Sequence, residues 1–146
     1  MISKLFKGKN MIETIQIEIK PTQNKRGNMR KIEKNMMTAI ENKKDFSNGN
    51  TSVNHFYVSN FEGVKTQVRL HGNLIAIITD IKTDTWQRND IELSSCGWET
   101  ATTKSRLNAL LAYTPFKIVQ KNFEWFVHSN ITNQLMPFYD GIKLPY

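Results

Sequence analysis

Three or four short segments rich in β-branched and aromatic residues follow one another between residues 51 and 94. Turn-forming residues separate them at residues 60–63, 72–73 and 83–85. The strands that this pattern predicts are residues 51–59, 64–71, 74–82 and 86–94. Connections this short join neighbouring strands in antiparallel order, because a parallel pair needs a long crossover. The chain is therefore expected to fold around an antiparallel sheet, with the apolar run 74–78 as its most buried strand.

Amphipathic segments on both sides of these strands predict two helices. Residues 29–44 carry apolar side chains at three- and four-residue spacing, which places them on one helical face. The members of that face are Ile32, Met36, Met37 and Ile40. Residues 103–113 predict the second helix, with hydroxyl residues at 100–103 as caps and Pro115 preventing its continuation. Its expected core face consists of Leu107, Ala109, Leu110 and Leu111.

The remaining segments complete the expected organisation. Ile15, Ile17 and Ile19 alternate with other residues and predict a short strand over residues 12–20, while residues 117–121 and 124–128 predict two more. The predicted division is a basic N-terminal strand and linker at 1–28, an α+β domain at 29–128 and an aromatic tail at 129–146. The fold class is α+β, with two helices packed on a single antiparallel sheet of about four to six strands.

The tail, residues 129–146, shows no clear periodicity and is expected to be irregular. It belongs to a C-terminal stretch with a large apolar load, which includes Trp125, Phe138, Tyr139 and Tyr146. Either the tail wraps the sheet and completes the core, or it forms a homodimer or partner interface, where aromatic residues are enriched.

The net charge of +7 is concentrated at one end of the chain. Residues 1–44 contain eleven Lys and Arg against four acidic residues, whereas residues 45–146 contain nine of each. This asymmetry is typical of a basic arm and helix attached to a neutral body. It favours an acidic partner, which can be a nucleic-acid backbone or an acidic protein surface.

The start of the second helix offers groups that suit a phosphate. A helix N-terminus presents unpaired backbone N–H groups and a partial positive charge. Thr102 and Thr103 add hydroxyl donors there, and Lys104 and Arg106 add full positive charges. The alternative is that Thr102 or Thr103 merely caps the helix and the two basic side chains are solvated.

A second group of basic residues lies in and before the first helix. Lys25, Arg26, Arg30, Lys31 and Lys34 fall within one short stretch that also contains glycine and asparagine. Such a stretch can follow a nucleic-acid backbone and makes binding strongly dependent on salt. The alternatives are a solvated arm that aids solubility and a contact with an acidic protein.

No pattern in the sequence is typical of a catalytic or cofactor site. His55, His71 and His128 lack the spacing of metal ligands, and Cys96, the only cysteine, excludes a disulfide framework and multi-cysteine zinc sites. The triplet at residues 80–82 has the acid–x–Lys spacing of several nuclease sites, but no second acid is tied to it. We therefore expect no enzyme activity, no metal and no cofactor. The chain also lacks a signal or membrane-spanning run, which favours a reducing cytoplasm and no membrane contact.

Three stretches in the middle of the chain carry a resemblance to a known family. They read GNTSV at residues 49–53, LHGNLIA at 70–76 and GWETATTKSRLNALL at 97–111. Together with the helix from Met29, they resemble a family of small, uncharacterised proteins of tailed bacteriophages that has no assigned activity or catalytic residues. Residues before Met29 and after Tyr113 lie outside the match. The resemblance implies a phage origin and the host-cell cytoplasm as the place of action.

The order helix, three antiparallel strands, helix is also similar to the double-stranded-RNA-binding domain, whose second helix meets phosphates with its N-terminal end. In that likeness Lys104 and Arg106 contact phosphates, and the basic residues of the first helix extend the surface. We therefore expect a phage-encoded, non-catalytic protein that contacts the phosphates of DNA or RNA. The alternative is an interaction protein that binds and modulates a host or phage protein, in host takeover or anti-defence.

Overall fold

The computed structural model describes residues 29–58 and 62–146, and within these ranges it contains two helices and nine strands. In chain order the elements are α2 (Lys31–Glu41), β1 (Phe46–Asn48), β2 (Thr51–Tyr57), β3 (Glu62–Leu70), β4 (Asn73–Lys82), β5 (Gln87–Leu93), α3 (Ala101–Leu110), β6 (Phe116–Lys121), β7 (Glu124–Ser129), β8 (Leu135–Pro137) and β9 (Ile142–Pro145). The predicted α+β class is confirmed, although the strands form two sheets instead of one.

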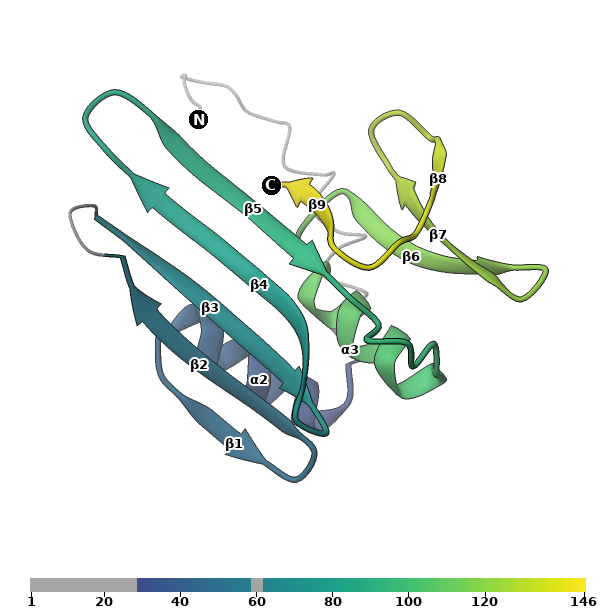
Figure 1. The fold of residues 1–146 in the computed structure, drawn as a ribbon, viewed down its shortest axis with the longest axis horizontal. Helices are drawn as coiled ribbons and strands as arrows, with labels where there is room; N and C mark the ends of the chain where they lie inside the picture. Colours follow the sequence, from purple (N-terminus) through teal and green to yellow (C-terminus); the bar gives the residue numbers. More distant parts are fainter. Residues whose placement is uncertain (1–28, 59–61) are drawn as a thin grey trace, which may run out of the picture.

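The larger sheet has six strands in the order β1-β2-β3-β4-β5-β9, and all its pairs are antiparallel (Figure 1). The four strands predicted between residues 51 and 94 are β2 to β5, each paired with its predecessor in the chain. Strand β1 lies in a segment for which no strand was predicted. It forms because Phe46 pairs with Val53 and its side chain packs against the core.

The central strand β4 is buried less evenly than its apolar sequence predicts. Ile75 and Ala76 are buried, whereas Leu74, Ile77 and Ile78 are only partly buried. The core cluster contains residues from both helices and from the sheet, including Met36, Val53, Val68, Leu93 and Leu107. In Figure 1, α2 lies behind the sheet and α3 lies beside it, near the end of β5. Helix α2 packs on β1 and β2, and α3 packs on β4 and β6.

The two helices confirm most of the expected core residues and change their limits. The second helix begins at Ala101 instead of residue 103, and its predicted core face at residues 107 and 109–111 is buried. In α2, Met36 and Met37 are buried as predicted, but Ile32 and Ile40 are only partly buried. Their expected places in the core are taken by Ala39 and by a carboxylate, Glu33.

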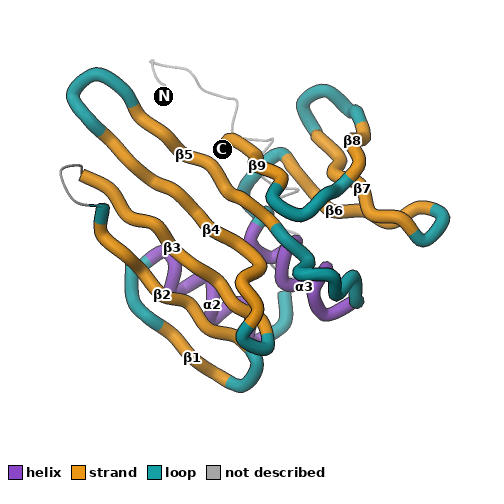
Figure 2. Tube along the Cα trace, in the orientation of Figure 1, coloured by secondary structure: helices purple, strands orange, loops and turns teal. Residues whose placement is uncertain are grey.

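The predicted strands at residues 117–121 and 124–128 exist as β6 and β7, but they form a separate sheet with β8 (Figure 2).

The expectation of an irregular tail at residues 129–146 is wrong. Strand β8 pairs with β7, and β9 adds to the larger sheet, where Leu144 lies opposite Ile91 and both are buried. Trp125 and Phe138 stack edge to face with ring centroids 5.5 Å apart. Part of the tail therefore completes the core.

Two further expectations concern the N-terminal segment and the similarity to the double-stranded-RNA-binding domain. The strand predicted at residues 12–20 and the linker after it lie outside the described residues. Five strands, instead of the three of the double-stranded-RNA-binding domain, separate α2 from α3. In the described part of the chain, no helix is long and apolar enough to cross a membrane.

Candidate nucleic-acid interface

Arg106 lies inside the molecule and not on the expected phosphate-binding surface. The residue is 3% exposed, on the side of α3 that faces the sheet and α2. Its guanidinium donates from Nη1 to Glu33 Oε2 (2.8 Å), from Nε to Thr51 Oγ1 (3.0 Å) and from Nη2 to Asn50 Oδ1 (3.2 Å). Burial and these three internal acceptors withdraw Arg106 from any external phosphate, which corrects its expected role.

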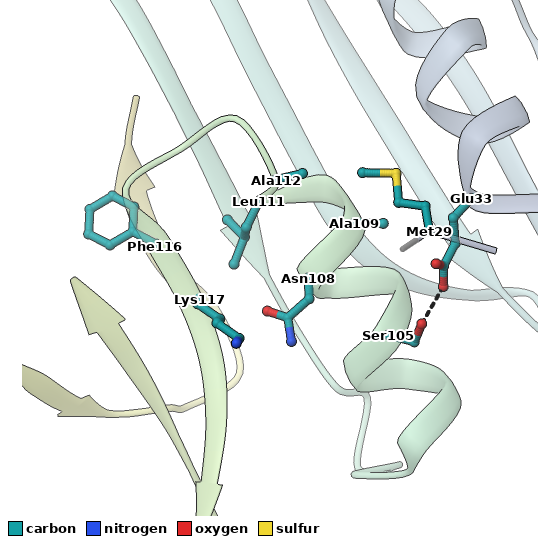
Figure 3. A pocket seen from close by; sticks show the side chains of 9 residues that line it. All are labelled: Met29, Glu33, Ser105, Asn108, Ala109, Leu111, Ala112, Phe116 and Lys117. Carbon is teal, nitrogen blue, oxygen red and sulfur yellow. Dashed lines mark hydrogen bonds between the residues drawn. The ribbon is translucent and has the colours of Figure 1, made fainter. Parts of the chain in front are cut away.

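Glu33 is the buried counter-charge of Arg106. It is 2% exposed, and Figure 3 shows it facing Ser105 across the gap between α2 and α3. Oε2 accepts from Ser105 Oγ as well as from Arg106, and Oε1 accepts from the backbone N–H of Arg30 at the start of α2 (3.1 Å). One carboxylate thus caps α2 and neutralises the guanidinium. A buried charge is costly unless it is paired and hydrogen-bonded in this way.

The network around Arg106 extends to the turn between β3 and β4. Thr51 Oγ1 donates to Asn50 Oδ1 (2.8 Å), so two of the three acceptors of the guanidinium are themselves linked. The backbone N–H of His71, at that turn, donates to the carbonyl of Asn50 (2.7 Å). The network therefore connects both helices, the start of β2 and the β3–β4 turn.

The outer side of α2 carries cations without matching acids. Arg30, Lys31 and Lys34 are exposed, and we call these three residues the α2 basic face. Glu33 lies between Lys31 and Lys34 in the sequence, but its side chain points inward. Glu41 is the only exposed acid of the helix. Two further residues expected to extend this surface, Lys25 and Arg26, lie outside the described residues.

The start of α3 is capped by the first of the hydroxyl residues at 100–103 that were expected to cap it. Thr100, and neither Thr102 nor Thr103, caps the helix, because its Oγ1 accepts from the Thr103 N–H (3.1 Å). Thr103 is buried with its hydroxyl 3.0 Å from that of Thr100. Thr102 and Lys104 are partly exposed, and Lys104 Nζ donates to Gln120 Oε1 of β6 (3.3 Å). Of the four residues expected here, these two remain near the surface.

A cavity of about 280 Å³ lies between α2, α3 and β6 (Figure 3). Asn108 of α3 holds β6 in place. Its side chain accepts from the Ile118 N–H (2.7 Å) and donates to the Ile118 carbonyl (3.0 Å). Next to Asn108 lies Lys117, an exposed cation that the sequence reasoning did not single out. The alternation of side chains along the predicted strand 117–121 could have indicated this cation, because it places Lys117 and Lys121 on the same face of the strand.

Two of the groups considered for catalysis, Cys96 and Asp80, have structural partners. Cys96 Sγ donates to the carbonyl of Leu74 (3.0 Å), and Asp80 Oδ1 accepts from Asn89 Nδ2 (2.8 Å). His55 has a buried Nε2 without a hydrogen-bond partner in the described structure. Across residues 29–58 and 62–146, no group of three or more His, Cys, Asp or Glu could hold a metal ion.

Two groups have shifted pKa values. The backbone N–H of His55 donates to Asp45 Oδ1 (2.9 Å), and this bond holds the pKa of Asp45 below its ordinary value. Burial raises the pKa of Tyr146, and the nearby carboxylate of Asp80 raises it further. Neither group belongs to the α2 basic face.

The family model described as Kyanoviridae Gp96 protein matches residues 29–145. The chain belongs to this family. The Gp96 proteins are cyanophage proteins of unknown function, so the expected phage origin is confirmed. The match includes both helices and all the strands described above, and it extends well beyond Tyr113, where the resemblance was expected to end. No curated protein and no solved structure matches the chain.

The three stretches that carried the resemblance meet in this Gp96 chain. Asn50 and Thr51 come from the first, His71 from the second and Arg106 from the third, and the bonds described above join them. A second cavity, of about 570 Å³, lies where the β3–β4 turn meets the start of α3. With the exception of Ser95, all of the residues that line it belong to the second and third stretches.

Proposed function

We propose that this Gp96 protein is a non-catalytic nucleic-acid-binding protein that contacts the phosphate backbone through the α2 basic face. The observation that carries the proposal is the burial of Glu33. Because this carboxylate is paired with Arg106 inside the molecule, it does not neutralise Arg30, Lys31 and Lys34 at the surface. The face is therefore more basic than the sequence count of α2 indicates.

The physical basis of binding is the release of counterions from the nucleic acid when lysine and arginine neutralise phosphates. The α2 basic face supplies three such cations, and Lys25 and Arg26 lie five and four positions before Arg30 in the chain. Lys104 on α3 and Lys117 on β6 supply two more cations. Both elements border the cavity of about 280 Å³ that lies next to α2. Arg106 is not part of this proposal.

The test is a titration of fluorescently labelled duplex DNA, duplex RNA and single strands, followed by anisotropy at several salt concentrations. Replacing Lys31 and Lys34 together with alanine removes two phosphate contacts. We expect weaker binding to all sequences and a log–log salt slope reduced by about two, since each contact contributes about 0.9. Both residues are exposed, so the double variant should melt at the wild-type temperature.

The matched control replaces Lys82 and Lys143 with alanine, which changes the net charge equally but removes exposed cations from β4 and β9 instead of α2. Affinity and slope should then stay close to wild type, apart from a small uniform effect of charge. Equal losses in both double variants would show that α2 is not the contact surface. Absence of binding to every probe at low salt would refute the proposed function altogether.

A second candidate function, binding to a host or phage protein, is favoured by the tip of the β6–β7 hairpin. Phe123 there is 93% exposed and has φ of 67°, a left-handed conformation that is costly for a bulky residue. Ile131 and Tyr139 of the same half of the chain are also exposed. An exposed aromatic residue at a position where glycine would be less strained is a candidate partner contact.

The two functions separate in a pull-down from host lysate with nuclease added. Capture that survives nuclease and is lost in Phe123→Gly supports a protein partner. Capture that nuclease abolishes, and that Lys31→Ala with Lys34→Ala weakens, supports nucleic acid. Phe123→Gly should itself fold at least as well as wild type, because glycine adopts positive φ at little cost.

A further inference from the structure

The cavity of about 570 Å³ at the β3–β4 turn has the dimensions of a small-molecule site. Leu70 and Ile75 supply apolar lining, and Trp98 is 63% exposed at this site. An indole with that exposure does not belong to the core, unlike Trp125. The cavity therefore combines an apolar lining with a flat aromatic surface that is open to a ligand.

Two tight turns hold the walls of this cavity in place. In the first, His71 and Gly72 both have positive φ (53° and 80°), and in the second, Cys96 and Gly97 do (52° and 82°). The second turn is closed by a bond from the Trp98 N–H to the Ser95 carbonyl (2.9 Å). Positive φ at two successive residues is the conformation of the tight turns that close hairpins. The indole is thus presented from a defined backbone.

Side-chain bonds anchor the second turn to the rest of the fold. Asp140 Oδ1 accepts from the N–H (2.7 Å) and the hydroxyl (2.9 Å) of Ser95, and Cys96 Sγ donates to the Leu74 carbonyl on β4 (3.0 Å). The first turn is held by the bond from the His71 N–H to Asn50. The cavity is therefore largely formed before any ligand arrives, which lowers the entropic cost of binding.

The polar groups of the cavity define the chemistry of a ligand. No lining residue is an acid, a lysine or an arginine. The ring of His71, the amide of Asn73 and the hydroxyl of Thr102 form no hydrogen bond with the described residues. A group that fits is uncharged, has a flat face for Trp98 and carries donors and acceptors on its edge. Heteroaromatic bases of nucleic acids have these three properties.

We infer that this cavity binds one unpaired nucleobase, stacked on Trp98 with its edge toward His71, Asn73 and Thr102. A base in a duplex has its faces stacked and its edge paired, so the site selects single strands. The inference deepens the proposed function and rests on it for the identification of the ligand as part of a nucleic acid. The α2 basic face supplies salt-dependent affinity, and the cavity supplies the preference for an unpaired strand.

The experiment uses the full chain and two kinds of probe. Free nucleosides, which carry no phosphate, are titrated while the Trp98 indole N–H signal is followed by NMR, assigned through Trp98→Phe. Single-stranded and duplex DNA of equal length are titrated in parallel by anisotropy. Nucleosides should shift the indole signal with little dependence on salt. Trp98→Ala should weaken single-strand binding about 5- to 150-fold, the range for one stacked base, and leave duplex binding unchanged.

Trp86→Ala is the matched control, because it removes another exposed tryptophan, in the β4–β5 connection. It should leave single-strand binding unchanged, while Trp98→Phe should retain most of the affinity. Equal single-strand losses in Trp86→Ala and Trp98→Ala would overturn the inference. So would an indole signal that responds to N-acetyltyrosinamide and to no nucleoside, since the site would then take a protein side chain.

The two proposals fail in different ways. Salt-dependent binding that is sensitive to Lys31 and Lys34 but indifferent to Trp98 and to nucleosides would overturn the cavity inference and leave the proposed function standing. Nucleoside binding at Trp98 without any polymer binding would support the base site and refute the phosphate-binding function.

Discussion

Nη1 of Arg106 lies 2.8 Å from Oε2 of Glu33, and both side chains are buried. The two residues are 73 positions apart, and their contact joins the inner sides of α2 and α3. Removing one partner of a buried pair leaves the other charge without compensation, which typically costs about 3–5 kcal/mol. The pair therefore holds the helices together instead of serving a ligand.

Arg106→Ala should reduce the free energy of unfolding by about 3–5 kcal/mol, measured by urea denaturation. Glu33→Gln should be destabilising for the same reason, and the effects of the two changes should not add. Lys104→Ala, two positions away and partly exposed, should change stability by less than about 0.5 kcal/mol. If Arg106→Ala melts like wild type and only loses nucleic-acid binding, Arg106 is a ligand contact after all.

Asp45→Asn should alter the pH dependence of stability. The bond from the His55 N–H lowers the pKa of Asp45 in the folded state, so the carboxylate stabilises the fold above its unfolded pKa, near 3.8. This contribution is lost as the pH falls through the lower, folded pKa. Wild type should therefore melt above Asp45→Asn at pH 6, and the difference should shrink as the pH falls below 3.8. Asp84→Asn removes the same charge at an exposed turn residue and serves as the matched control for the change in net charge.

Lys43→Gly should stabilise the protein. α2 ends with bonds from the Lys43 N–H to Ile40 and from the Lys44 N–H to Ala39, which place Lys43 at φ of 56°. Glycine relieves the cost of this left-handed conformation, about 1 kcal/mol, and should raise the melting temperature by about 2–4 °C in calorimetry. Lys44→Gly removes the same charge where φ is not positive. A gain no larger than that of Lys44→Gly would contradict the prediction.

Leu144→Ala should lower the free energy of unfolding by about 2–5 kcal/mol, the usual cost of deleting a buried leucine. Leu144 lies on β9, opposite Ile91, and is buried in the core. Lys143→Ala, on the outer side of the same strand, should be nearly neutral in the same denaturation experiment. Similar small effects of both changes would mean that the tail does not complete the core.

The six-stranded sheet was largely predictable because its pairing is mostly local. Strands β2 to β5 are joined by short connections, so alternation and turn residues within residues 51–94 were sufficient. Strands β1, β8 and β9 are only three or four residues long, which is too short for alternation in the sequence to predict a strand. Their conformation comes from the strands they pair with, as Ile142 does with Leu93, almost 50 residues earlier in the chain.

The amino-acid sequence by itself determined the α+β class, the antiparallel order of the central strands and the basic character of the first helix, since spacing along the chain carries each of these. Only the tertiary structure decided which charges reach the solvent. Arg106 and Glu33 look like surface residues in sequence, because a charged side chain is almost never fully buried unless it is paired, and no nearby residue in the sequence reveals the partner. Folding brings the two together and removes them from water, which leaves the α2 basic face without a local counter-charge.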